Sequence, residues 1–134
     1  MRAMVEIVDS SGTVLAYLMR GGEDPDRTTF PVPAESPLQV GFVVYSAGGE
    51  VERHEHLPVQ RRLDRTCEVL VVRSGRCEID LYDTRRRLVA TETLERDDVI
   101  LLVEGGHGLR MASDTVLLEV KQGPYTGLAE KERF

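Results

Sequence analysis

The sequence predicts an all-β fold built from short antiparallel strands. Short apolar runs recur along the 134 residues and are separated by turn-forming residues, whereas long stretches with helical spacing of apolar residues are nearly absent. The length predicts a single domain over residues 1–134 that can bury a useful core. Within it we expect N-terminal strands and an arm (1–38), the strands of the core (39–122) and a C-terminal tail (123–134).

The elements follow from this pattern in chain order. Glu6–Val8 and Val14–Met19 flank a turn rich in Ser and Gly and should form a hairpin. Four prolines in residues 21–37 predict an ordered arm. The apolar runs then predict strands at Gln39–Ser46, Glu52–Leu57, Cys67–Arg73, Arg76–Tyr82, Leu88–Leu94, Asp98–Val103 and Thr115–Lys121, followed by a short helical turn within 128–133.

The dipeptide Ser74-Gly75 predicts a two-residue hairpin turn between two of these strands. In that register Glu68 is the one carboxylate on an otherwise apolar inner face. A buried carboxylate is unfavourable unless it is paired, hydrogen-bonded or bound to a metal, so Glu68 is a candidate functional residue. Val69 and Val71 lie on the other face, where they either join a dimer interface or pack against flanking elements.

The three histidines of the chain predict a metal site. His54 and His56 are one residue apart, so both side chains lie on one face if the segment is a strand. His107 follows a later apolar run and is flanked by glycines, and a return beside the pair would bring three imidazoles together. Each residue also has a plainer reading: the pair as a solvated surface motif, and Glu68 as a core carboxylate paired with an arginine. Glu119 is a competing acid, which its apolar neighbours predict to face the other way.

These residues resemble the motifs of the cupin superfamily. Gly48, five residues, then His54-Glu55-His56 matches the start of its first motif, and Glu68, six residues, then Gly75 matches the end. Residues 97–107 resemble the second motif, with Val103 in place of the usual proline. Eleven residues separate His56 from Glu68, more than the family pattern has, so an enlarged hairpin should intervene.

The resemblance implies a double-stranded β-helix, the jelly-roll barrel of cupins, with a divalent metal near its open end. Residue by residue, it places His54, His56, Glu68 and His107 in the ligand positions. Zn, Ni, Fe, Mn and Cu all suit such ligands, so the metal stays open. Catalysis would use Glu68 and His107.

The function expected from this site is divalent-metal binding, with action on a small oxygen-rich molecule such as a carbohydrate derivative. Three alternatives stay open. One is a metal-independent sugar-nucleotide ketoisomerase or epimerase of polysaccharide biosynthesis, which the strand from Glu68 to Val72 also resembles. The others are an Fe(II) dioxygenase and a non-catalytic binding or sensing module. The expected substrate-binding residues near the mouth are Tyr45, Gln60, Arg110 and Tyr125.

The amino-acid composition excludes some classes of binding partner. The 17 basic and 23 acidic residues give a net charge of −6, which argues against nucleic acid as the main partner. We expect no membrane association, because no apolar run approaches the ~20 residues of a membrane span. With two cysteines and no evident signal peptide, the sequence predicts a cytoplasmic protein. The cupin resemblance further implies a homodimer.

Overall fold

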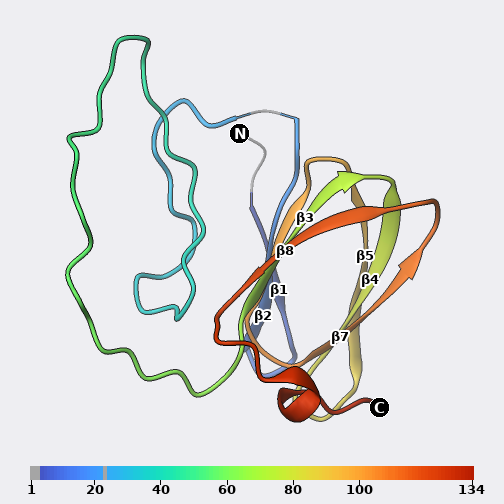
Figure 1. The fold of residues 1–134 in the computed structure, drawn as a ribbon. Helices are drawn as coiled ribbons and strands as arrows, with labels where there is room; N and C mark the ends of the chain where they lie inside the picture. Colours follow the sequence, from blue (N-terminus) through green and yellow to red (C-terminus); the bar gives the residue numbers. More distant parts are fainter. Residues whose placement is uncertain (1–3, 23) are drawn as a thin grey trace.

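The fold consists of two antiparallel sheets packed face to face, which confirms the all-β class (Figure 1). The structure is a computed structural model and describes residues 4–22 and 24–134. One sheet has five strands in the order β1-β2-β6-β3-β8, and the other has three in the order β5-β4-β7. The strands are β1 (Val5–Val8), β2 (Val14–Met19), β3 (Glu68–Ser74), β4 (Arg76–Tyr82), β5 (Leu88–Glu95), β6 (Val99–Leu102), β7 (Gly106–Met111) and β8 (Val116–Lys121).

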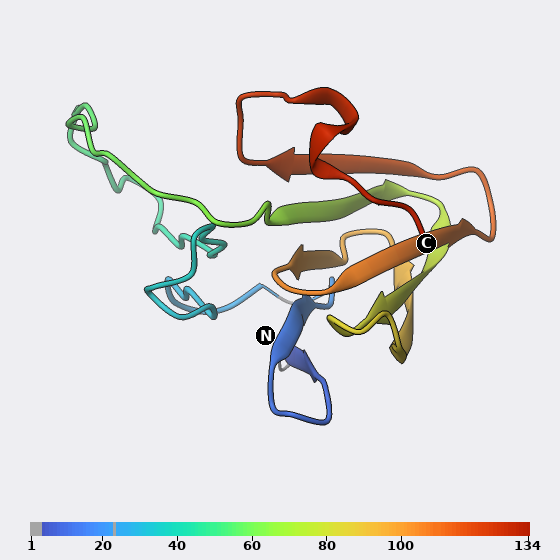
Figure 2. The same ribbon diagram turned by 90° about the horizontal axis from the view of Figure 1, so that it is seen from below.

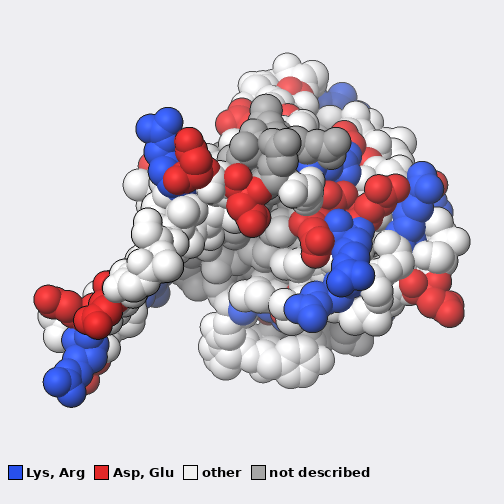
Figure 3. Space-filling view, turned by 90° about the horizontal axis from the view of Figure 1, so that it is seen from above, with Lys and Arg blue, Asp and Glu red and all other residues white. Residues whose placement is uncertain are grey.

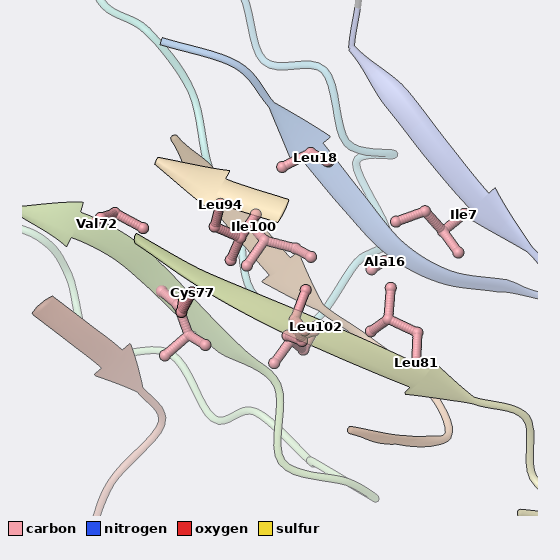
Figure 4. Close-up of a cluster of buried hydrophobic side chains, with 11 residues drawn as sticks. Ile7, Ala16, Leu18, Val72, Cys77, Leu81, Leu94, Ile100 and Leu102 are labelled. Atoms are coloured by element: carbon pink, nitrogen blue, oxygen red, sulfur yellow. The ribbon is translucent and has the colours of Figure 1, made fainter. Parts of the chain in front are cut away.

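The core lies between the two sheets and draws side chains from both (Figure 4). Leu18, Val72 and Ile100 enter it from the five-stranded sheet, and Ile79 and Leu94 enter it from the three-stranded sheet. All five are fully or almost fully buried. Burial of each such side chain contributes roughly 1.5–3 kcal/mol, so this layer fixes how the sheets sit on each other.

A second apolar cluster covers the outer face of the five-stranded sheet. Tyr17, Val69 and Leu101 lie on that face, and Val32 from the arm is buried against them. Leu38 and Val40 add to the same cluster. Val69 therefore packs against a flanking element of its own chain, which was one of the two readings that the sequence left open.

The predicted hairpin of β3 and β4 is wrong. β3 pairs with β6 and β8, whereas β4 pairs with β5 and β7, so the chain crosses from one sheet to the other at Gly75. The reason is that both strands carry an apolar face, and stacking those faces in opposite sheets buries both of them. The predicted facing was correct, because Leu70, Val72, Cys77, Ile79 and Leu81 all enter the core.

The strands predicted at 39–46 and 52–57 are absent from the described structure. The first segment makes only an isolated bridge between Phe42 and Thr29, and residues 51–60 are irregular and exposed. Residues 43–66 form a long loop that extends away from the sheets (Figures 1 and 2). The physical reason is plain for 52–57, where only Leu57 is apolar, so a strand there would have no face to bury.

The remaining predicted elements agree with the structure, with one strand missed. The N-terminal hairpin and the strands at 76–82, 88–94, 98–103 and 115–121 are confirmed within one or two residues, and the helical turn is Gly127–Glu130. β7 was not predicted, because Gly106 and Gly108 interrupt the strand pattern. In the described part of the chain, no helix has the length and apolar character needed to cross a membrane.

Candidate functional site

The candidate site is an open cleft of about 930 Å³ at one end of the sandwich. Its floor is apolar, and one rim is polar. The floor is lined by Leu70, Leu102, Leu109 and Leu117, and the rim by Glu68, His107, Glu119 and Lys121. A concave apolar surface with a few convergent polar groups is the usual form of a small-molecule site.

His107 and Glu68 meet across the two sheets at this rim. His107 Nε2 lies 2.8 Å from Glu68 Oε1, with 34% of the imidazole and 15% of the carboxylate side chain exposed. His107 is on β7 opposite Leu81, and Glu68 begins β3 opposite Leu102. The core strands behind them therefore hold the two groups in place, while solvent still reaches the imidazole.

The turn into β7 depends on Gly105. Its φ is +74°, and a Cβ at this position would lie 2.0 Å from the carbonyl oxygen of Tyr82. Only glycine meets both conditions, since side chains disfavour positive φ and this backbone approach leaves no room. Gly105, two residues before His107, therefore has a direct role in placing that histidine.

The carboxyl group of Glu68 is held in its ionised form. The hydrogen bond from His107 lowers the pKa of Glu68, and a hydrogen bond shared with Glu119 and the charges of His107 and Lys121 lower it further. Burial opposes these effects. The hydrogen bonds prevail because each acts directly on the charged form.

Glu119 is a site residue that the sequence reasoning missed. It lies opposite Leu70 in the β3–β8 ladder, so it faces the cleft beside Glu68, and the prediction that it faces the other way is wrong. The hydrogen bond with Glu68, burial and the Glu68 charge together raise the pKa of Glu119. Strict alternation along β8 gives the signal, because Leu117 faces the core from the same side.

Lys121 supplies the positive charge of the rim. Its Nζ lies 3.6 Å from Glu119 Oε1 and 3.8 Å from Glu130 Oε1. It also lies 5.7 Å from the ring centroid of Tyr125. Lys121 faces Glu68 in the β3–β8 ladder, so the ammonium group stands close to the His107–Glu68 pair.

The C-terminal residues form the far wall of the cleft. The ring of Phe134 packs edge-on against Tyr82 at 5.1 Å between centroids, and the Arg86 guanidinium lies 4.9 Å from the Phe134 centroid. Arg86 also forms an ion pair of 2.5 Å with Glu132. A Cβ on Gly106, next to His107, would meet the Phe134 ring at 2.8 Å. The tail thus closes over the strand that carries His107.

His54 and His56 lie elsewhere. Both are exposed on the irregular segment 51–60, where their ring centroids are 5.4 Å apart. His54 Nδ1 is 2.7 Å from the carbonyl oxygen of Glu52, which makes this contact local. Of the four proposed ligands, the structure brings together Glu68 and His107 and keeps the other two apart from them, because residues 51–60 do not join a sheet.

The four expected substrate-binding residues have different positions. Tyr45 and Gln60 are exposed on the loop. Arg110 lies on the outer face of the three-stranded sheet, where it pairs with Glu78 and Asp80. Tyr125 is exposed beside Lys121, which makes it the one of the four that is near the polar rim.

The described side chains do not gather into the four-ligand set that the resemblance implies. Within residues 4–22 and 24–134, no group of three or more His, Cys, Asp or Glu side chains is placed to hold one ion. Glu68 and His107 instead bond directly to each other. The contact places a carboxylate at one ring nitrogen of His107, an arrangement that orients an imidazole.

Charge on the surface is mixed. In the view of Figure 3, acidic and basic side chains are interspersed, and the protruding loop carries both signs.

Comparison with known proteins gave no matching family model, no matching curated protein and no matching solved structure.

Proposed function

We propose that the cleft binds a small oxygen-rich molecule, such as a carbohydrate derivative, and that His107 transfers a proton on it. The observation that carries this proposal is the 2.8 Å contact between His107 Nε2 and Glu68 Oε1 at the rim of an open cleft. The reaction class that suits it is isomerisation or epimerisation next to a carbonyl group, which moves a proton and needs no oxidant or reductant.

The chemistry follows from which nitrogen is free. In neutral His107, Nε2–H donates to the Glu68 carboxylate, so Nδ1 carries the lone pair and can accept a proton from carbon. The imidazolium that forms is stabilised by the adjacent carboxylate. The exposed imidazolium exchanges its proton with solvent. Isomerisation is completed when the imidazolium gives a proton to the neighbouring carbon and the enediol hydroxyl proton passes to the other oxygen. Epimerisation is completed when water gives a proton to the opposite face of the same carbon and the imidazolium releases its proton to solvent. Both routes restore the neutral imidazole.

The other rim residues suit an oxygen-rich ligand. Lys121 is a donor that can bind a carbonyl or enolate oxygen, which acquires negative charge as the proton leaves. Glu119 can bond to ligand hydroxyl groups. The apolar floor suits the carbon face of a sugar ring.

Isotope exchange tests the proposal. The protein is incubated in D2O with a panel of free ketoses, aldoses and keto-sugar nucleotides, and deuterium entering the carbon next to the carbonyl is followed by NMR. We expect exchange with at least one member, and its loss in His107→Gln. His56→Gln is the matched control, because it removes an exposed imidazole from the loop. Absence of exchange across the panel, or equal rates in His107→Gln and wild type, would contradict the proposal.

Divalent-metal binding is the second candidate function. It belongs with the proposal that the two sheets form a cupin-type jelly roll. It is favoured by the two loop imidazoles, which lie 5.4 Å apart between centroids and can face a common ion. β7, which carries His107, is an edge strand, so segment 52–57 could add beside it and bring the histidines together.

Elemental analysis tests this second candidate. It predicts metal in the protein as purified and its loss in a variant with both His54→Ala and His56→Ala. Equal metal content in that variant and wild type would exclude these two ligands. A metal-free wild-type protein that still exchanges deuterium would leave the proton-transfer function standing alone.

A further inference from the structure

We propose that two copies of this chain pair through β8, so that the two five-stranded sheets join as one continuous antiparallel sheet across a two-fold axis. The pairing uses the free edge and the outer face of β8, whose inner face lines the cleft, and it does not depend on the proposed function.

β8 is the apolar edge of the molecule. It pairs with β3 on one side, and no strand in the described part of the chain covers its other side. Val116, Leu118 and Val120 are 58%, 48% and 48% exposed and form a row along its outer face. Unpaired backbone groups beside an apolar row form a template for another strand, and soluble proteins normally protect such edges.

The other three sheet edges are protected by polar residues or by their short length. β1 has only four residues and carries an exposed Glu6. β5 alternates threonine and glutamate through its middle. β7 contains two glycines, and its Arg110 is paired with Glu78 and Asp80. Of the four edges, β8 is thus the one with three exposed apolar side chains in an uninterrupted row.

The exposed row continues an apolar surface that the chain covers elsewhere. On the same outer face, the arm residue Val32 is buried against Tyr17, Val69 and Leu101, which belong to β2, β3 and β6. That cluster does not include a β8 residue. The apolar outer face therefore extends past its cover by one strand, and a second β8 at this edge would cover the unpaired side of that strand.

Side-chain parity and charge select one register for the pair. If Leu118 lies opposite Leu118 of the second copy, Val116 lies opposite Val120 in both directions, and six apolar side chains form one row. A shift by one residue on each strand in one direction sets Glu119 opposite Glu119, which is unfavourable. The shift in the other direction places Val120 opposite Asp114. The Leu118-centred register is the one without either conflict.

Cysteine cross-linking tests both the pairing and the register. Cα atoms directly opposite on antiparallel strands are roughly 4.5–5.5 Å apart, which a disulfide can bridge. Leu118→Cys should therefore form a covalent dimer on mild oxidation. Val116→Cys is the matched control: it should cross-link poorly alone and efficiently when combined with Val120→Cys. Cys67 and Cys77 are buried and free, so wild type should give little cross-linking.

Light scattering provides the independent measurement. We expect wild type to reach twice the 15.0 kDa of the chain as its concentration rises. Leu118→Glu should weaken the dimer at least about tenfold, whereas Leu88→Glu, at an exposed position on β5, should not. A mass of 15.0 kDa at all concentrations, or a dimer in which Leu118→Cys cross-links no faster than Val116→Cys, would overturn the proposal.

Discussion

The 2.8 Å contact between His107 Nε2 and Glu68 Oε1 joins the edge strand of the three-stranded sheet to β3 in the five-stranded sheet. Glu68 is followed on β3 by the core residues Leu70 and Val72, and His107 is followed on β7 by Leu109, which packs against the core. The packing of the two sheets therefore sets the distance between the two groups, and the site depends on the sandwich as a whole.

Glu68→Gln should separate orientation from charge. The amide oxygen can still accept a hydrogen bond from His107 but cannot stabilise an imidazolium. We expect kcat for deuterium exchange to fall by about 100-fold or more while KM changes little. Steady-state kinetics by NMR measures both. An exchange rate within a factor of two of wild type would show that Glu68 does not assist proton transfer.

Substitution of Gly75, where the chain crosses between the sheets, should lower the free energy of unfolding. Gly75 has φ +87°, and an added Cβ would lie 2.1 Å from the Asp114 carbonyl oxygen. Gly12 has a similar φ of +89° with nothing within 4 Å of the added Cβ. Gly12→Ala should therefore lower the free energy of unfolding by about 1 kcal/mol, and Gly75→Ala by more than about 3 kcal/mol. Denaturant titration compares them, and equal losses would show that the overlap at Gly75 is relieved without cost.

Truncation of Ile79 should loosen the contact between the sheets. Ile79 is fully buried in the cluster that both sheets share. We expect Ile79→Ala to lower the free energy of unfolding by about 2–5 kcal/mol, because the lost methyl groups leave a cavity. Leu88→Ala, at an exposed position on β5, should change it by less than about 0.5 kcal/mol. Comparable losses in the two variants would contradict the assignment of this core.

Stability should fall in acid in part through Asp80. Arg110 and Thr91 donate hydrogen bonds to its carboxylate and lower its pKa below the usual 3.8. A carboxyl group with a lowered pKa in the folded state stabilises that state above its unfolded pKa. That contribution is lost as pH falls through the lowered value. Asp80→Asn should therefore flatten the decline in stability below about pH 4. Unfolding curves across this range measure it, and an unchanged slope would show that Asp80 is not a source of the effect.

The sequence predicted most of the sheet and one half of the site. The alternation of residues along the strands predicts that Leu70, Val72 and Ile79 face the core. Glu68 is the carboxylate on that same face. His107 was identified as a candidate, although its strand was not, because two glycines remove the side chains that strand patterns rely on.

The partners of those residues depend on tertiary pairing. Ser74-Gly75 has the composition of a hairpin turn. Because β3 pairs with β6 and β8 and not with β4, the chain crosses between the sheets at this point. The pattern predicts that Glu119 faces outward, because apolar Leu118 and Val120 on the opposite side of the strand are typical of core residues. In the structure β8 lies at an edge and exposes both. Local sequence does not reveal which strand is an edge.

Ligand contacts can be mapped on the folded protein by NMR. The ligand is the member of the sugar panel that shows deuterium exchange, titrated into isotopically labelled protein while backbone amide resonances are followed. If the cleft is the binding site, saturable shifts should occur at Glu68, His107 and residues 117–121, and residues 50–60 should be unaffected. Shifts confined to the loop at 50–60, with the cleft residues unchanged, would contradict this assignment.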